Sequence, residues 1–200
     1  MLGSVHMLFS PLKNKDYTEA KHCITLFPGV CKVPSTTGEL PLHYAIREEA
    51  PLELIELLIV EYPEALELKS GTNREYPLSL ALSSSTNQYS SVFLSRLINV
   101  SSVSFGCFNF LGEPPLLSAI NCTAIIDENS RLMIIQRMLE VNSSSIKYED
   151  EMGNMALHHA IKSGASVAVI KILYVADRSV KDVEDGDCEL LEYDWDSLEG

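Results

Sequence analysis

The stretch Pro41-Leu42-His43-Tyr44-Ala45-Ile46 decides how this chain folds, because it recurs three more times with gradual loss of similarity. The later copies are Pro77-Leu78-Ser79-Leu80-Ala81-Leu82, Pro115-Leu116-Leu117-Ser118-Ala119-Ile120 and Ala156-Leu157-His158-His159-Ala160-Ile161. Successive copies begin 36, 38 and 41 positions apart. Internal similarity at a period of this size is typical of stacked-repeat proteins. Such stacks present long surfaces to partners and rarely carry out chemistry themselves.

The composition supports an ordered core and argues against nucleic acid as a partner. The chain has 200 residues, of which 46% are hydrophobic, and a formal net charge of −13. Residues 182–200 contain nine Asp or Glu and no Lys or Arg, which leaves 19 acidic and 15 basic residues in the rest of the chain. Most affinity for nucleic acid comes from basic contacts to phosphate, and this sequence has no basic stripe.

The cysteines and the first residues favour a cytoplasmic protein, with a nuclear location as the alternative. The five cysteines form no C-x-x-C pair, so we interpret them as reduced thiols. Residues 1–9 lack a charged start followed by a sustained apolar stretch, so no secretory signal is predicted. No run approaches the ~18 apolar residues that a membrane span needs.

The Pro-Leu-His-x-Ala pattern resembles the ankyrin repeat, whose T-P-L-H-x-A signature recurs about every 33 residues. An ankyrin repeat has a glycine three residues before the proline, and Gly38, Gly112 and Gly153 stand there, while the second copy has Arg74. The family also favours Asp or Asn three residues before that glycine, as at Asp150 and Asn109. Such a pair is typical of a turn, because the side chain bonds its own backbone and glycine accepts a positive φ.

The resemblance also implies a paired aliphatic in the second helix of each unit, twelve residues after the alanine. Leu57–Leu58 and Ile172–Leu173 stand there, whereas Leu97–Ile98 and Met138–Leu139 come sixteen and nineteen residues after their alanines. We therefore predict insertions of four and seven residues between the helices of the second and third copies. The inserted stretches, around 83–91 and 121–130, are rich in Ser, Thr and Asn and are predicted to be loops.

The resemblance implies an all-α solenoid of helix-turn-helix units joined by β-turn or finger loops. We predict four ankyrin-like repeats over 41–181, a degenerate N-terminal repeat or cap over 1–40, and an acidic C-terminal tail or partial cap over 182–200. Residues 16–27 are predicted to form the second helix of the N-terminal unit. The residues expected to hold the repeat motif together are Pro41, Leu42, His43, Ala45, Pro77, Leu78, Ala81, Pro115, Leu116, Ala119, Leu157, His158 and Ala160.

No residue pattern predicts catalysis, a cofactor or a metal. The resemblance implies a structural role for His43 and His158, with each imidazole bonded to the backbone of the neighbouring finger. His158 and His159 are adjacent, so on a helix they would point about 100° apart, which is unsuited to one metal ion. The sequence contains no Gly-rich phosphate loop, no G-x-S-x-G and no H-E-x-x-H.

The resemblance implies partner binding through the finger tips and the exposed face of the first helices. By position, the predicted partner-binding residues are Thr37, Glu39, Arg47, Glu48, Asn73, Glu75, Phe110, Leu111, Glu113, Met152, Asn154 and Lys162. Most are polar, whereas Phe110, Leu111 and Met152 are apolar. Apolar side chains on a surface mark contact sites, although adjacent fingers could instead bury these three against each other.

These observations predict a non-enzymatic module, an adaptor or scaffold that binds a protein, with no small-molecule substrate and no membrane insertion. Two alternatives remain. The chain could be the regulatory or targeting part of a larger enzyme, or an acidic regulator that acts through its tail. The tail interleaves acids with Leu190, Leu191, Tyr193 and Trp195, so it could fold on a basic groove of a partner or dock back as a polar cap.

Overall fold

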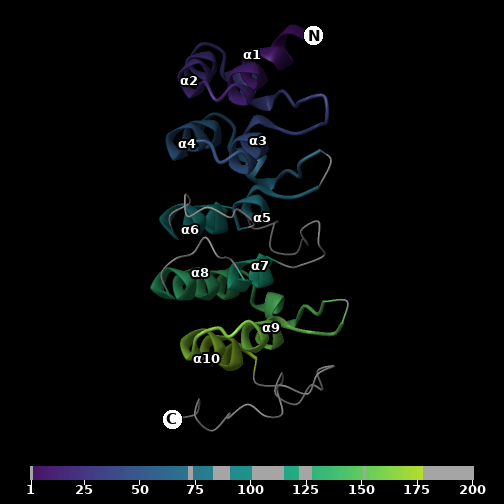
Figure 1. Cartoon of the computed structure of the whole chain (residues 1–200), viewed down its shortest axis with the longest axis vertical. Coiled ribbons are helices and arrows are strands. Elements are labelled where there is room, and N and C mark those ends of the chain that lie inside the picture. Colours follow the sequence, from purple (N-terminus) through teal and green to yellow (C-terminus); the bar gives the residue numbers. More distant parts are fainter. Residues whose placement is uncertain are drawn as a thin grey trace.

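The computed structural model describes residues 2–71, 74–82, 91–100, 115–121, 128–150 and 152–177. Helix pairs stack one above another along the long axis, and their described helices form two parallel rows (Figure 1). The inner row consists of α1 (Leu2–Lys13), α3 (Pro41–Arg47), α5 (Pro77–Leu82), α7 (Pro115–Asn121) and α9 (Ala156–Lys162). The outer row consists of α2 (Tyr17–Leu26), α4 (Leu52–Glu61), α6 (Ser91–Val100), α8 (Glu128–Val141) and α10 (Val167–Ala176).

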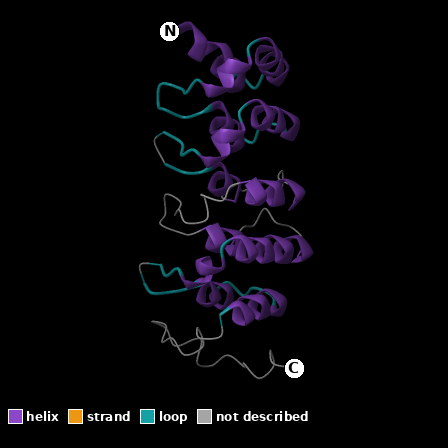
Figure 2. Cartoon of the chain, turned by 180° about the vertical axis from the view of Figure 1, so that it is seen from behind, coloured by secondary structure: helices purple, strands orange, loops and turns teal. Residues whose placement is uncertain are grey.

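Long loops project from the side of the inner row, opposite the outer row (Figure 2). We call these loops fingers and number them by the repeat copy that each precedes. The first finger comprises residues 34–40, the second 69–76 and the fourth 148–155. The described part of the chain contains helices and loops but no strand, so the predicted all-α ankyrin-like solenoid is confirmed.

The inner helices begin where the repeated motif begins. Leu40 is extended and precedes Pro41, whose missing N–H costs nothing in the first turn of a helix. The leucine and the alanine of every copy are buried, as the stacking interpretation predicts: Leu42, Ala45, Leu78, Ala81, Leu116, Ala119, Leu157 and Ala160. Each buried leucine contributes roughly 1.5–3 kcal/mol, and the small alanines let neighbouring helices approach closely.

The turn from inner to outer helix is the same in three helix pairs. Lys15, Glu49 and Gly164 adopt left-handed conformations, with φ of 57°, 54° and 67°. In each pair, the amide of the next residue donates to a carbonyl five residues back, as from Ala50 to Ala45 at 2.9 Å and from Ala165 to Ala160 at 2.8 Å. The same bond joins Asp16 to Pro11 at 2.9 Å, so α1 and α2 form a helix pair of the same construction.

The outer helices correct the predicted register of the second and third copies. The residue that follows each of α4, α8 and α10 donates its amide to a carbonyl four residues back, which belongs to Leu58, Met138 and Leu173 respectively. These three residues are therefore equivalent. Met138 follows Ala119 by 19 positions and Leu58 follows Ala45 by 13, which makes the insertion six residues rather than seven. Leu97–Ile98 and Leu58–Ile59 are buried pairs at the same positions within α6 (Ser91–Val100) and α4 (Leu52–Glu61), so the other insertion is three residues rather than four.

The prediction that residues 121–130 form a loop was partly wrong. Asn121 still belongs to α7, and α8 already begins at Glu128. As a result α8 has 14 residues, whereas α4 and α10 have 10 each. Part of the insertion in the third copy therefore adds a turn of helix. None of the helices in the described ranges is long and apolar enough to cross a membrane.

Candidate partner-binding surface

Each described finger is closed at its base by a backbone hydrogen bond. The Ser35 amide donates to the Glu39 carbonyl at 2.8 Å, and the Asp150 amide donates to the Asn154 carbonyl at 2.9 Å. Between these partners, Gly38 and Gly153 adopt φ of 80° and 83°, where an L side chain is strained. Both fingers therefore share one turn, which agrees with the glycines that the sequence analysis singled out.

The second finger has the same closure with one extra residue. The Ser70 amide donates to the Glu75 carbonyl at 2.8 Å, so Ser70 takes the place of Ser35 and Asp150. Ser70 stands four residues before Arg74, whereas Ser35 and Asp150 stand three residues before their glycines. Arg74 stands where the other fingers have glycine and keeps the left-handed conformation, with φ of 55°.

Gly71 lies directly against the first finger. A Cβ atom at this position would come within 2.7 Å of the Gly38 Cα atom and would also collide with the Thr37 carbonyl oxygen. Only glycine allows this approach of two backbones. The first and second fingers are therefore in contact and form one continuous surface.

The fourth finger is organised around the Asp150 carboxylate. Oδ1 accepts hydrogen bonds from the amides of Met152 and Asn154, both at 2.8 Å. Oδ2 accepts from Asn154 Nδ2 at 3.1 Å and pairs with His159 Nε2 at 2.9 Å. Burial alone would raise the pKa of Asp150, but the hydrogen bonds from Asn154, Met152 and His159 lower it to about 2. The carboxylate is thus ionised at neutral pH and fixes the backbone on both sides of the tip.

The first finger uses a hydroxyl and a buried ion pair instead. Ser35 Oγ accepts from the amides of Thr37 and Glu39, at 3.3 and 3.2 Å. The Glu39 carboxylate is buried and binds Arg47 Nη1 at 2.6 Å, and Arg47 Nε lies 3.4 Å from Glu48 Oε1. Burial raises the pKa of Glu39, and the neighbouring Arg47 guanidinium opposes that shift. The Arg47 guanidinium also lies over the Tyr44 ring, 5.2 Å from its centroid.

A hydrogen bond from His43 connects the first repeat to the second. His43 Nε2 donates to the Leu68 carbonyl at 2.8 Å, just before the second finger. This bond to the backbone beside the second finger agrees with the structural role that the resemblance implies for His43. Burial lowers the pKa of His43 to about 4, against the opposing effect of the hydrogen bond, so the ring is neutral at pH 7. In the last copy, His158 Nδ1 accepts from the Met155 amide at 2.9 Å.

The structure divides the predicted partner-binding residues into three groups. Exposed side chains belong to Thr37, Arg47, Glu48, Met152 and Lys162. Three residues expected on the exposed fingers are at most 5% exposed, namely Glu39, Glu75 and Asn154. Their carbonyls close the fingers, so the chain turns their side chains inward, and the prediction of exposed side chains was wrong for them. The predicted residues outside the described ranges are Asn73, Phe110, Leu111 and Glu113, together with the acidic tail.

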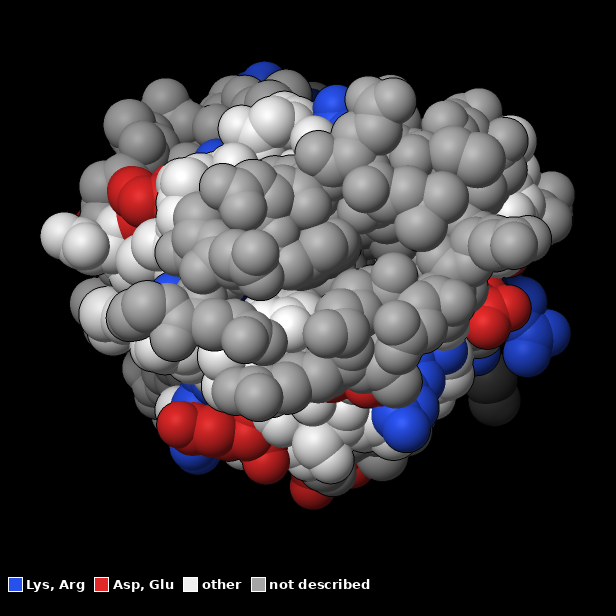
Figure 3. Space-filling view, turned by 90° about the horizontal axis from the view of Figure 1, so that it is seen from below, with Lys and Arg blue, Asp and Glu red and all other residues white. Residues whose placement is uncertain are grey.

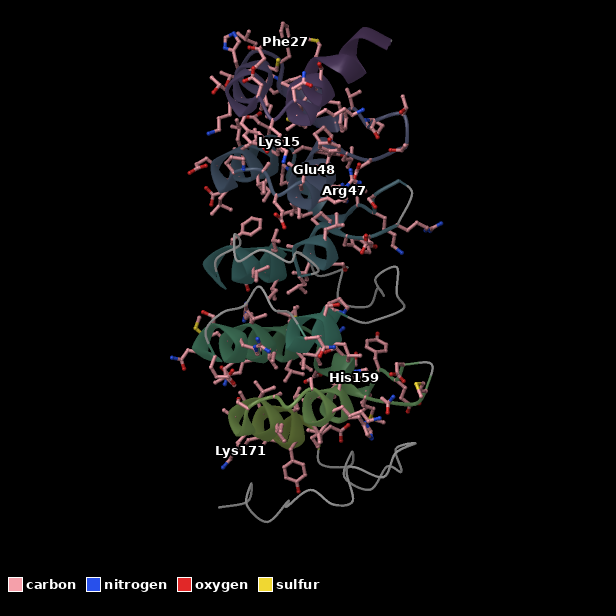
Figure 4. All side chains as sticks on the ribbon, viewed as in Figure 1. Lys15, Phe27, Arg47, Glu48, His159 and Lys171 are labelled. Atoms are coloured by element: carbon pink, nitrogen blue, oxygen red, sulfur yellow. The ribbon has the colours of Figure 1, made fainter. Side chains whose placement is uncertain are left out.

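Residues at the finger side that the sequence analysis missed are Tyr44, Lys69 and His159. Figure 4 places Arg47 and His159 on the finger side of the stack and Lys171 on α10, away from the fingers. A signal for His159 was present, since it follows the repeat histidine and stands nine positions after Asp150. Its pairing with Asp150 depends on how the finger folds back over α9.

The described residues at the C-terminal end of the stack carry charges of both signs. Viewed from that end, acidic and basic side chains of the described residues lie close to one another around the rim (Figure 3). Within the described ranges, no three His, Cys, Asp or Glu side chains are grouped so that they could hold a metal ion.

The fold is similar to that of a solved ankyrin repeat protein. The crystal structure of the ankyrin repeat protein EF0377 superposes with a TM-score of 0.67 at 18% sequence identity, covering 94% of this chain and 90% of that chain. A second similar structure is the predatory endopeptidase Bd0816 from Bdellovibrio bacteriovorus in complex with the immunity protein Bd3460. It has a TM-score of 0.62 at 19% identity and covers 86% of this chain and 81% of that chain. No protein-family model and no curated protein matches the sequence.

Proposed function

We propose that this chain is a non-enzymatic module that binds a partner protein through its finger tips and the exposed face of its inner helices. The fold favours this role, because a stack presents one long surface built from consecutive repeats. A structure with a similar fold is itself a protein–protein complex. Fold alone does not establish function, so the proposal depends on the surface described above.

The proposal rests mainly on Met152, whose side chain is exposed while its backbone is hydrogen-bonded. Its side chain is 77% exposed at the tip of the fourth finger, while its amide is held by Asp150 at 2.8 Å. An exposed methionine is an adaptable apolar contact. A tip already ordered before binding loses little further conformational entropy in a complex.

Four more exposed residues extend the proposed surface along the stack. Arg47 and Glu48 lie at the end of α3, and the Arg47 side chain is held by two carboxylates. Lys162 lies at the end of α9 and donates to Asn154 Oδ1 at 3.3 Å. Thr37 lies on the first finger, where its hydroxyl is 2.8 Å from Ser35 Oγ. The first finger thus holds Thr37 and Arg47, and the fourth finger holds Lys162 and Met152, so the proposed surface is ordered at both fingers.

Capture of a partner from a soluble lysate of the source cells would test the proposal. The intact chain is compared with Met152→Ala and with Val175→Ala, a matched control that removes an exposed apolar side chain from the outer helix α10. We expect a protein identified by mass spectrometry to be retained by the intact chain and by Val175→Ala, and to be lost or strongly reduced with Met152→Ala. A partner retained equally by all three proteins, or no specific partner for the intact chain, would contradict the proposed surface.

A further inference from the structure

The second finger exposes two cations that no described carboxylate neutralises. Lys69 directly precedes Ser70, and Arg74 lies inside the loop that the hydrogen bond between Ser70 and Glu75 closes. Arg47, Arg137 and Lys147 each lie within 4.0 Å of a carboxylate oxygen. Among the residues that the structure describes, neither Lys69 nor Arg74 has such a partner. Lys69 Nζ instead lies over the Tyr76 ring, 5.3 Å from its centroid.

The backbone at Arg74 favours glycine, not arginine. The equivalent residues of the first and fourth fingers are Gly38 and Gly153, and all three have positive φ. A side chain in the left-handed region costs conformational free energy that glycine does not. Arg74 thus adds a cationic side chain to the finger at a conformational cost, as Lys15 and Glu49 add side chains to the inter-helix turns.

Uncharged polar groups border these cations. Gly71 lies against Thr37 and Gly38, so the second finger touches the first. Thr36 and Thr37 are exposed there and add hydroxyl donors. We use the name basic finger surface for Thr36, Thr37, Lys69 and Arg74. A guanidinium can bind a carboxylate through two parallel hydrogen bonds, and a lysine ammonium adds a point charge.

The outer side of the neighbouring repeat carries the opposite charge. The helix α4 and the 3-10 helix η2 (Pro63–Glu67) contain five glutamates and no Lys or Arg: Glu53, Glu56, Glu61, Glu64 and Glu67. Like charges disfavour the docking of an acidic ligand on this side. The charge distribution therefore directs such a ligand toward the fingers.

We propose that the basic finger surface binds an acidic segment of a partner protein, with Arg74 and Lys69 contacting its carboxylates. The inference rests on the proposed function, since it names the chemistry of the partner for one part of the finger surface. Arg74 supplies the oriented contact, and Lys69 strengthens the local positive field. Binding weakens as salt is added, because exposed charges are screened.

The test measures binding of a fluorescein-labelled (Glu-Ala)6 peptide to the intact chain, to Arg74→Gly and to Lys15→Gly. The two variants are matched, because each removes one exposed cation and one non-glycine residue with positive φ, 55° and 57° respectively. Lys15 lies in the α1–α2 turn, outside the fingers. We expect the Kd to rise about tenfold with Arg74→Gly, as for loss of a charge-assisted contact, and to change less than about twofold with Lys15→Gly.

Thermal unfolding of the same proteins separates recognition from folding. Relief of strain predicts that the Tm of Arg74→Gly equals or exceeds that of the intact chain, so weaker binding would not reflect a damaged fold. No peptide binding, an unchanged Kd for Arg74→Gly, or equal losses in both variants would overturn the inference. Displacement of the peptide by an equal concentration of a thymidine oligonucleotide of the same length would also overturn it, because the surface would then select any polyanion.

The inference and the proposed function can fail separately. If the lysate partner is captured through Met152 but the acidic peptide does not bind, the finger surface is correct and its assigned chemistry is wrong. If the peptide binds through Arg74 but no partner depends on Met152, the binding surface lies at the first two fingers only.

Discussion

The first and fourth fingers have the same backbone closure but different side chains that hold it. The first relies on the Ser35 hydroxyl and on the buried pair of Glu39 with Arg47. The fourth relies on the Asp150 carboxylate, which accepts hydrogen bonds from two amides and from Asn154 Nδ2 and pairs with His159. A glycine with positive φ is common to both. The two copies therefore share the backbone turn, whereas the side-chain contacts that stabilise the turn differ between them.

The difference matters for binding, because a charged acceptor forms stronger hydrogen bonds than a hydroxyl. The fourth finger presents its apolar tip, Met152, on the more strongly held turn. The first finger presents small polar groups, Thr36 and Thr37, on the weaker one. A finger held by several charged contacts suits a contact that must be ordered before the partner arrives.

The largest expected effect tests what the two regions share, namely the stacked core. Leu157→Asp places a carboxylate among buried apolar side chains and should cost ~3–5 kcal/mol in free energy of unfolding. Leu42→Asp should have a similar effect, because the two leucines occupy equivalent buried places. Urea unfolding of both variants measures the costs. An unchanged midpoint for Leu157→Asp would mean that the fourth repeat is not part of the stack.

The second effect separates the two regions by pH. The pKa of His43 is about 4 in the folded chain and about 6.5 when unfolded, so only the unfolded state binds the proton between these values. The contribution of His43 to the free energy of unfolding is fully present above about pH 6.5 and decreases by roughly 3 kcal/mol as the pH falls to 4. His43→Gln should flatten this part of the curve of unfolding free energy against pH.

Asp150 acts in a lower pH window. Its pKa is about 2 in the folded chain, against 3.8 without these contacts. Its contribution is present above about pH 3.8 and is lost as the pH falls toward 2. The first repeat should therefore weaken at a higher pH than the fourth finger. A difference between the intact chain and Asp150→Asn that stays constant from pH 6 to pH 2 would refute this.

The third effect compares the two side chains that accept the amide hydrogen bonds of the fingers, Asp150 and Ser35. Asp150→Ala leaves two amides and an imidazole without their acceptor and should cost about 2 kcal/mol, whereas Ser35→Ala should cost about 0.5–1 kcal/mol. Hydrogen exchange of the Met152 and Asn154 amides should accelerate in Asp150→Ala, and the Gly38 region should be unaffected. Equal costs for the two substitutions would contradict the ranking of the anchors.

The smallest expected effect comes from introducing the hydrogen-bonding residues of the fourth finger into the first. The double variant Ser35→Asp/Glu39→Asn reproduces in the first finger the pair that Asp150 and Asn154 form in the fourth. It also removes the ion pair of Glu39 with Arg47, so the free energy of unfolding should change by less than about 1 kcal/mol. Ser35→Asp alone should destabilise the chain, since the new carboxylate would face Glu39. Denaturant midpoints of the two variants check both expectations. A stabilising single substitution would show that the fingers differ in more than these side chains.

Several parts of the architecture followed from local patterns in the sequence. The recurrence of Pro-Leu-x-x-Ala located the starts of three inner helices, because proline fits the first helical turn, and the related copy that begins at Ala156 located a fourth. The leucine and the alanine of all four copies are buried. The structural role of His43 also followed, from its place in the motif. The register of the outer helices was misjudged by one position at Met138, since adjacent aliphatic residues cannot reveal which of them faces the core.

The candidate surface was predicted less well than the fold. Glu39 and Asn154 stand next to turn residues and have polar side chains, which suggests exposure, yet finger closure turns both inward. Arg74 was visible as a departure from the motif, but its left-handed backbone was not. The likeness of the closures of the three fingers also could not be seen, because the second has an extra residue.

Repeat period, helix starts and core positions were readable from the chain alone, because they depend on residues close together in sequence and on a regular alternation of apolar and polar side chains. The tertiary structure was needed for the contact of Gly71 with the first finger and for the pair of Asp150 with His159. It was also needed to show that Lys69 and Arg74 have no carboxylate partner among the described residues. Each of these depends on distances between segments that the stack brings together. The periodicity of the sequence predicts which residues are buried, whereas the tertiary packing determines which residues of other segments they contact.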